Sequence, residues 1–365
     1  MENNNSLWSL FQQKNLSRRN FLKTCVTITG ILGLPPMMVS QVVAAAEKKI
    51  LVPVIWMHGH ECTGCDEAFL RSQTPLASDV ILNMISLEYM DVLAAAAGEP
   101  LEHHLQEVMK KYDGKYLLIV EGAVPLGDDG ISCMVGGKPF LHNVKEVAKG
   151  ADAVIEVGSC ATWGGIQAAR PNPTNSVAVS DVIKGKTIIK IPGCPPIPEV
   201  LTGVIMHYTL FGQIPPLDSR GRPKQFYGNR IHDTCYRRAF FDAGMFVERF
   251  DDAGSKAGWC LYKVGCRGPE SYNSCGNLRW WNGLSYPIQS GAPCVGCSEP
   301  NFWDHDPLYE RMPNIPVPNV IANADKVGLI AAGALTAGVL VHGALSAVQH
   351  KKHHAEKHEA EKDKE

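Results

Sequence analysis

The spacing of the cysteines constrains this fold more than any other feature of the sequence. The chain has 365 residues and 12 cysteines, and two pairs have the spacing C-x2-C, Cys62/Cys65 and Cys294/Cys297. Each pair encloses a glycine, Gly64 or Gly296, and Pro293 precedes the second pair. A disulfide between cysteines this close is strained, whereas two thiolates in a tight loop are a common ligand pair for soft metals. The pattern therefore indicates metal sites rather than a disulfide framework.

The overall charge excludes one broad class of function. The net charge is −2, and 45% of the residues are hydrophobic. No basic stretch has the character of a phosphate-binding face, so we expect no nucleic-acid partner. A chain of this length can bury the cores of two ordinary domains.

The N-terminal segment, residues 1–46, has the pattern of a twin-arginine export signal. Arg18-Arg19 precedes a moderately apolar run over 24–43, which ends in an A-x-A cleavage site at 44–46. This route exports folded proteins, which suits a protein that receives metal cofactors before it crosses the membrane. Cys25 lies inside the signal and would be removed with it.

A second terminal segment has the pattern of a membrane anchor. The run Val327–Val348 contains no Asp, Glu, Lys or Arg and is long enough to span a bilayer. We predict a transmembrane helix over 326–349; a buried core helix is the alternative. The charged tail, 350–365, starts with basic residues and would stay in the cytoplasm, which places the body on the periplasmic side of the cytoplasmic (inner) membrane.

Between these ends, short apolar runs alternate with helical patterns. The predicted strands are 50–57, 80–87, 116–121, 153–157 and 187–191. The predicted helices include 66–72, 101–112, 138–149 and 197–211. Strands that are rich in Ile, Val and Leu without strict alternation are typical of a parallel sheet buried on both faces. The order βαβα predicts an α/β fold with a flavodoxin-like, doubly wound parallel sheet over 47–225.

Several functional candidates follow the ends of these strands. Cys62 and Cys65 follow the first strand, Glu121 ends the third, Cys160 follows the fourth and Cys194 follows the fifth. The carboxyl edge of an open α/β sheet is where ligands bind. The four cysteines are therefore predicted to meet there and to complete a site with four thiolates.

The segment 226–325 has little strand or helix periodicity and is dense in Gly, Pro, Trp and Cys. A region of this length needs another source of order, which bound metal clusters can supply. Its candidate ligands are His232, Cys235, Cys260, Cys266, Cys275, Cys294 and Cys297. We therefore predict that the sheet is followed by an irregular iron–sulfur cluster domain.

The number of ligands favours three iron–sulfur sites. Eleven cysteines remain beyond the leader. Cys133 lies apart from the paired spacings and is left out, which gives ten. With His232 included, the number of candidate ligands is eleven. They divide into two sets of four for 4Fe–4S clusters and one set of three for a 3Fe–4S cluster. Zinc also binds four cysteines. However, three sites in a row, one of them short of a ligand, fit an electron relay better than structural zinc.

Four longer motifs carry a resemblance to a known family. They are ECTGC over 61–65, GSCATWGG over 158–165, IPGCPP over 191–196 and PCVGCSEPNFW over 293–303. These motifs, together with the signal and the anchor, look like those of nickel–iron hydrogenase small subunits of the membrane-bound, uptake type.

The resemblance implies three ligand sets and two protein partners. The proximal 4Fe–4S cluster would be held by Cys62, Cys65, Cys160 and Cys194. The distal 4Fe–4S cluster would be held by His232, Cys235, Cys260 and Cys266, and the medial 3Fe–4S cluster by Cys275, Cys294 and Cys297. The nickel–iron centre would belong to a large subunit. The electron acceptor would be a membrane cytochrome b or an equivalent quinone-reducing subunit.

The resemblance also implies roles for residues near the clusters. Glu61 and Glu121 would influence charge near the proximal cluster or serve as hydrogen-bond partners. Pro287 would stand near the position that a fourth thiolate of the medial set could take. Oxygen-tolerant relatives carry two additional cysteines at the proximal cluster. The corresponding positions here are Gly64 and Gly165, which implies a conventional, oxygen-sensitive enzyme.

Overall fold

Parallel strand pairing organises the body of the protein. The computed structural model describes residues 8, 11, 12, 17–48, 51–73, 75–304, 308–310 and 324–362. Within these residues, five strands form one parallel sheet in the order β2-β1-β3-β7-β9. The strands are β2 (Ser86–Met90), β1 (Pro53–His58), β3 (Tyr116–Glu121), β7 (Ala151–Val157) and β9 (Ile188–Ile191). This is the flavodoxin-like strand order, which confirms the predicted α/β sheet.

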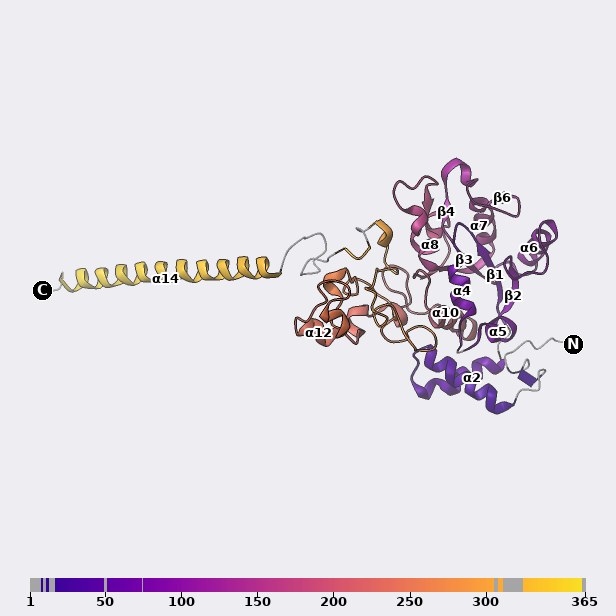
Figure 1. Ribbon diagram of the computed structural model, residues 1–365, viewed down its shortest axis with the longest axis horizontal. Helices are drawn as coiled ribbons and strands as arrows, with labels where there is room; N and C mark the ends of the chain where they lie inside the picture. Colours follow the sequence, from indigo (N-terminus) through magenta and orange to yellow (C-terminus); the bar gives the residue numbers. More distant parts are fainter. Residues whose placement is uncertain are drawn as a thin grey trace. The chain divides into compact units, whose positions relative to one another are not determined.

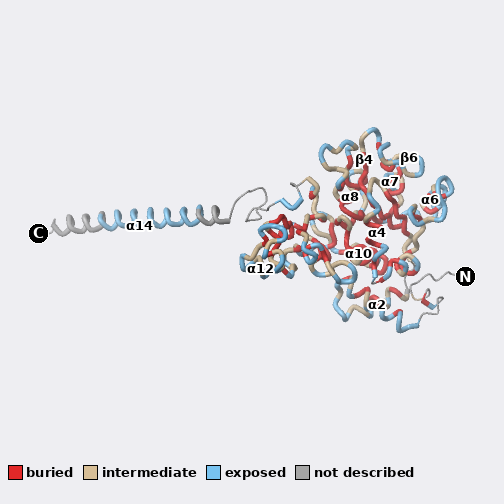
Figure 2. Tube along the Cα trace, in the orientation of Figure 1, coloured by how far each residue is buried: buried red, intermediate tan, exposed pale blue. Residues whose placement is uncertain are grey.

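The two faces of the sheet enter two separate cores. On β1, Val54 and Trp56 belong to one core, whereas Ile55 and Met57 belong to the other, as the two-residue period of a strand requires. The first core includes residues of α4 (Gly64–Leu70) and α10 (Pro198–Phe211), and the second includes residues of α6 (Glu99–Lys111) and α7 (Phe140–Lys149). Figure 1 shows these elements around the sheet, and Figure 2 shows that the sheet is the buried centre. Burial on both faces explains the continuous apolar runs in the sequence.

The second predicted strand, 80–87, is wrong in its first half. Residues Val80–Met84 form a π-helix, η2, and β2 begins only at Ser86. Val80, Asn83 and Met84 are buried while Leu82 is exposed. Burial at positions i, i+3 and i+4 has the period of a helix, which a run of apolar residues conceals.

The strand predicted over 116–121 has the bounds of β3, and the other predicted elements occur with shifted ends. The predicted helix 138–149 starts with strand β6 (Lys138–Pro139), which pairs with β5 (Met134–Val135) before α7 begins. A second short pair joins β4 (Val124–Pro125) to β8 (Ser176–Val177). The connections also contain α5 (Ala77–Asp79), η3 (Gly127–Gly130), α8 (Gly158–Trp163), η4 (Ile166–Ala168) and α9 (Val179–Val182).

Among the described residues from 224 to 304, the regular elements are short helical turns. These are α11 (Lys224–Tyr227), η5 (Ile231–Thr234), α12 (Arg238–Asp242), α13 (Ala253–Lys256), η6 (Tyr262–Val264) and η7 (Phe302–Asp304). Buried residues of this segment, including Val247, Leu261 and Ile288, join the core that contains α10. The irregular segment and the sheet therefore pack as parts of one compact unit, Met1–Glu310.

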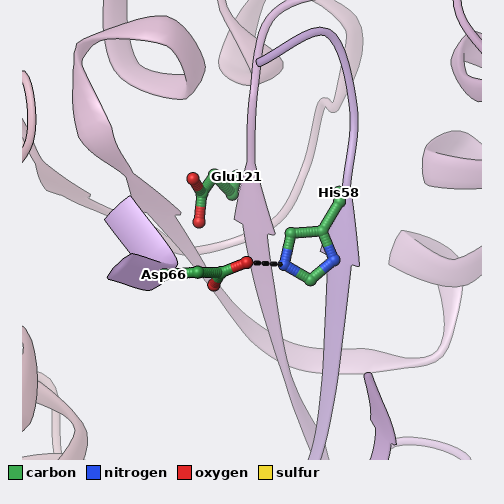
Figure 3. Close-up of side chains that lie close together, drawn as sticks. All are labelled: His58, Asp66 and Glu121. Carbon is green, nitrogen blue, oxygen red and sulfur yellow. Dashed lines mark ion pairs between the residues drawn. The ribbon is translucent and has the colours of Figure 1, made fainter. Parts of the chain in front are cut away.

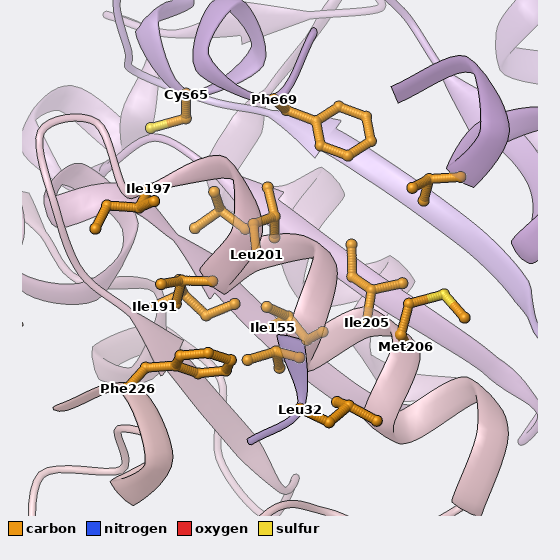
Figure 4. Close-up of a cluster of buried hydrophobic side chains, with 14 of the residues drawn as sticks. Leu32, Cys65, Phe69, Ile155, Ile191, Ile197, Leu201, Ile205, Met206 and Phe226 are labelled. Atoms are coloured by element: carbon orange, nitrogen blue, oxygen red, sulfur yellow. The ribbon is translucent and has the colours of Figure 1, made fainter. Parts of the chain in front are cut away.

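The predicted leader forms helices that pack on the body. Helices α2 (Arg18–Ile31) and α3 (Val39–Lys48) contact α10, with the turn η1 (Pro36–Met38) between them. Figure 4 shows Leu32, at the end of α2, in the same cluster as Ile205 and Phe226. The Gln225 side chain donates a hydrogen bond of 2.8 Å to the carbonyl of Ile31. Residues 1–7, 9, 10 and 13–16 of the leader lie outside the described residues.

The second unit, Arg311–Glu365, contains one long helix. Helix α14 runs from Ala324 to Lys362, and its stretch Ile330–Lys351 is long and apolar enough to cross a membrane, by length and composition alone. These 22 residues span about 33 Å as an α-helix. Side chains along this stretch, such as Leu335 and Val339, are exposed. The last three residues of the predicted tail lie outside the described residues.

A buried ion-pair cluster joins the end of β1 to its neighbours. The His58 imidazole pairs with Asp66 of α4 at 2.9 Å and with Asp91, which follows β2. Figure 3 shows His58 and Asp66 facing each other beside Glu121, the last residue of β3. Burial alone would lower the pKa of His58, but the two carboxylates outweigh it and raise this pKa from 6.5 to about 10. The imidazole is therefore a buried cation at neutral pH.

Replacing His58 should destabilise the body strongly. Because His58→Gln leaves two carboxylates without their cation, we expect a loss of about 3–5 kcal/mol, measured as a lower unfolding temperature of the purified protein. The matched control is His142→Gln, because the pair of His142 with Asp129 is largely exposed and should contribute less than about 1 kcal/mol.

The pH dependence provides a second readout. The folded pKa of His58 is raised, so its contribution is complete below pH 6.5 and is lost as the pH rises through about 10. The difference between wild type and His58→Gln should therefore shrink from pH 6 towards pH 10. An unchanged difference over this range would contradict the charge assignment.

Candidate metal centres

Four thiols converge at the carboxyl edge of the sheet. Cys62 and Cys65 lie where β1 leads into α4, Cys160 lies in α8 after β7, and Cys194 follows β9. Burial, and then repulsion from Glu121 and the other three thiols, raises the pKa of Cys65 well above its usual range. Burial likewise raises the pKa of Cys160 to about 12. The structure thus brings together the predicted proximal set.

Glycines allow the backbone to approach these sulfurs. A Cβ atom at Gly158 would lie 2.4 Å from the Cys65 Sγ, and the φ of Gly158 is +81°. A Cβ at Gly165 would lie 2.6 Å from the Cys160 Sγ, and one at Gly64 would lie 3.2 Å from the Cys62 Sγ. Both positions that the resemblance identified for additional thiols therefore border the proximal set.

The predicted distal set lines one cavity. His232, Cys235, Cys260 and Cys266 all contribute to its wall, together with Arg237 and Ile288. The enclosed volume is about 10 Å³, which is close to the space that a single water molecule needs. Three thiols and one imidazole around one cavity are soft donors of the kind that bind an iron–sulfur cluster or a zinc ion.

The predicted medial set is buried in the irregular segment. Burial, and then repulsion from Cys297 and Cys294, raises the pKa of Cys275 well above its usual range. The Gly296 N–H donates to the Cys294 Sγ at 3.4 Å, and the Cys294 thiol lies 3.7 Å from the Ser271 hydroxyl. Three thiols therefore share one buried site.

Electrostatic interactions between thiols of different sets indicate their order in space. Cys297 of the medial set is close enough to Cys194 of the proximal set for the two thiolate charges to repel each other. The medial Cys294 interacts in the same way with Cys235 and Cys266 of the distal set. The medial thiols therefore lie between the proximal and distal thiols. None of the twelve cysteines, all of which are described, forms a disulfide.

Two predicted acidic residues lie beside the proximal set. The Cys65 N–H donates to Glu121 Oε1 at 3.2 Å. Burial and then the nearby Asp66 raise the pKa of Glu121 to about 9, and burial also raises the pKa of Glu61.

The sequence did not identify two further residues beside the proximal set, His58 and Asp66. Their ligand atoms and that of Glu121 lie within 4.8 Å of one another; the position of His58 at a strand end was the available signal.

Pro287 does not contact the medial thiols in any interaction that the structure gives. It is exposed in a turn, and its neighbours face the distal set: the Tyr286 hydroxyl donates to the Cys235 Sγ at 3.6 Å, and Ile288 lines the distal cavity. Its role at the medial site stays a prediction.

Comparisons with known proteins agree with this arrangement. The profile of the family "NADH ubiquinone oxidoreductase, 20 Kd subunit" matches residues 62–208, and that of the C-terminal region of the NiFe/NiFeSe hydrogenase small subunit matches residues 227–310. The uptake hydrogenase small subunit of Azotobacter vinelandii is 53% identical over 330 residues, which are 90% of this chain and 92% of that protein. The hydrogenase-1 small chain of Escherichia coli is 48% identical over 354 residues, 97% of this chain and 95% of that protein.

A solved structure shares the fold. The [NiFeSe] hydrogenase of Desulfovibrio vulgaris Hildenborough matches with a TM-score of 0.66 and 35% identity, and the match covers 71% of this chain and 98% of that one. High identity over nearly the whole length, both profiles and the shared fold lead to one conclusion: this chain belongs to the family of nickel–iron hydrogenase small subunits of the uptake type.

Proposed function

We propose that this protein transfers electrons from the H2-activating centre of a large subunit to a membrane acceptor through three iron–sulfur clusters. The observation that carries the proposal is the continuous series of thiol sets, which runs from the sheet edge through the irregular segment to the distal cavity. Bound at these sites, the clusters would supply one-electron redox chemistry. A cytochrome b or an equivalent quinone-reducing subunit would accept the electrons.

The proposed ligand assignment follows the three sets. Two 4Fe–4S clusters and one 3Fe–4S cluster are the proposed cofactors, and the ligands are those that the resemblance implies. Burial supports the assignment, because a thiolate in an apolar interior is costly unless a cation stabilises it. Clustering of three or four such groups is then favourable only when bound metal compensates for their charge.

Polar groups around the sulfurs would stabilise the thiolate forms and adjust the cluster potentials. At the distal set, the Arg237 N–H donates to the Cys235 Sγ at 3.4 Å, and the Tyr286 hydroxyl donates to the same sulfur. The Arg237 guanidinium is held by the carbonyl of Trp259 at 2.7 Å. Hydrogen bonds to sulfur and a nearby positive charge both favour the reduced, more negative state. These residues would thus make the distal site a ready electron acceptor.

The proposal assigns a role to each part of the chain. Residues 1–46 would be the cleaved twin-arginine signal, 47–225 the sheet domain with the proximal cluster, and 226–325 the medial and distal cluster domain. Residues 326–349 would anchor the protein at the periplasmic side of the inner membrane, with 350–365 in the cytoplasm. The apolar stretch of α14 supports the anchor by its length and composition.

Removal of one medial thiol tests the ligand assignment. Cys275→Ala should lower the iron content of the purified heterodimer by about three atoms and abolish the 3Fe signal in electron paramagnetic resonance. Cys133→Ala is the matched control: Cys133 is also partly buried but packs in the other core, and its loss should change neither value. A colourless wild-type protein that contains zinc would overturn the proposal.

Truncation tests the anchor. A stop codon after Asp325 should release a soluble enzyme that reduces dyes with H2 but no longer reduces quinone, because the apolar helix is lost. A stop codon after Lys352 removes most of the polar tail but leaves the apolar stretch intact, and should leave the enzyme in washed membranes. Membrane retention of the shorter protein would show that another contact holds it.

Replacing both leader arginines tests the export route. Arg18→Lys together with Arg19→Lys should leave hydrogenase activity in the cytoplasm, measured after cell fractionation. Arg170→Lys with Arg279→Lys changes the same number of arginines outside the leader and should not affect location. Periplasmic activity in the first variant would contradict a twin-arginine signal.

A further inference from the structure

Ser159 joins three loops that carry proposed ligands. It lies in α8, one residue before Cys160, and is 1% exposed. Its N–H donates to the Gly193 carbonyl at 2.8 Å, and the Gly193 N–H donates back to the Ser159 Oγ at 3.0 Å. The Ser159 hydroxyl in turn donates to the carbonyl of Cys297, 138 residues away. One buried side chain thus connects the Cys160 and Cys194 loops of the proximal set to a medial ligand.

A second contact holds the same segments together without touching Gly193. The Trp163 indole N–H, also in α8, donates to the carbonyl of Ser298 at 3.2 Å. Lys190 lies 4.4 Å from the centre of the Trp163 ring and donates to the Thr162 carbonyl at 3.0 Å. The segment 297–298 is therefore attached to α8 twice, and only the Ser159 contact continues to the Cys194 loop.

We propose that Ser159 is a positioning residue for electron transfer: its hydroxyl fixes the proximal ligand loops against the medial ligand Cys297. It thereby provides one hydrogen-bonded connection between the two sites and holds the geometry of the direct hydrogen bond from the Cys194 N–H to the Cys297 sulfur. The proposal rests on the ligand assignment given above. Its physical basis is that electronic coupling through a chain of covalent and hydrogen bonds exceeds coupling across a gap between groups in mere contact. In the buried interior, this small network is also fully satisfied, which holds its geometry.

Loss of the Ser159 hydroxyl would disturb both the position of the ligand loops and the hydrogen-bonded connection between the sites. Without it, the Gly193 N–H loses its acceptor and the Cys297 carbonyl loses its donor, in a region closed to water. Buried polar groups left without partners shift to find new ones, at a cost in stability. The two loops would then move apart. The connection through Ser159 would be interrupted, and the direct hydrogen bond from the Cys194 N–H to the Cys297 sulfur would lengthen.

A pair of nearly isosteric substitutions isolates the hydroxyl. Ser159→Thr keeps the hydroxyl, whereas the valine of Ser159→Val has the shape of threonine but carries a methyl group in place of the hydroxyl. Trp163→Phe is the matched control, because it removes the other attachment of 297–298 and leaves the Ser159 network intact. Each purified heterodimer is first analysed for iron and for its 3Fe signal, so that only fully loaded protein is compared. A wild type without the 3Fe signal would instead refute the ligand assignment on which the proposal rests.

Two measurements then test the role. The first is the rate at which the 3Fe signal disappears after rapid mixing with H2, followed by freeze-quenching. The second is H2/D2 exchange, which occurs at the nickel–iron centre and needs no relay. Ser159→Val should reduce the medial site at least tenfold more slowly than wild type, with unchanged exchange, while Ser159→Thr and Trp163→Phe stay within about twofold. A wild-type rate in fully loaded Ser159→Val, or equal slowing in Trp163→Phe, would overturn the proposal.

Discussion

Parallel strand pairing is the constraint on which the rest of this structure depends. Because β1, β3, β7 and β9 run in the same direction, their carboxyl ends meet at one edge of the sheet. The residues that follow these strands are therefore brought together although they are far apart in the sequence. Cys65, Glu121, Cys160 and Cys194 occupy this edge for that reason. If any one of these strands ran antiparallel to the others, the residue that follows it would lie at the opposite edge of the sheet.

Burial is the second constraint, and it acts on thiols and charges alike. The interior raises the pKa values of Cys65 and Cys275, so that both thiols would keep their protons in the absence of a compensating charge. The same interior accepts the Asp66 carboxylate because His58 carries a positive charge beside it, and His58 also pairs with the partly exposed Asp91. In the irregular segment, metal ligation would supply the cohesion that regular hydrogen-bond ladders supply in the sheet. The two halves of the body are thus ordered by different interactions around one continuous core.

Much of this arrangement could be predicted from the sequence, because its signals are local. The strand predicted over 116–121 has the bounds of β3, since an uninterrupted apolar run marks a strand buried on both faces. Cysteine spacing likewise identifies residues that the structure groups together. The strand predicted over 80–87 is wrong in its first half because η2 buries an apolar run with a helical period. Contacts such as that of Ser159 with Cys297 depend on tertiary packing across 138 residues, and no local pattern contains them.

The central claim is that three separate iron–sulfur clusters occupy the three thiol sets. Anomalous X-ray scattering from crystals of the heterodimer, recorded at the iron and zinc absorption edges, tests it most directly. The account predicts three compact iron peaks in this chain: one among Cys65, Cys160 and Cys194, one among Cys275, Cys294 and Cys297, and one in the cavity lined by His232 and Cys260. Single-ion peaks that appear at the zinc edge, or an iron peak missing from any of the three sets, would contradict it.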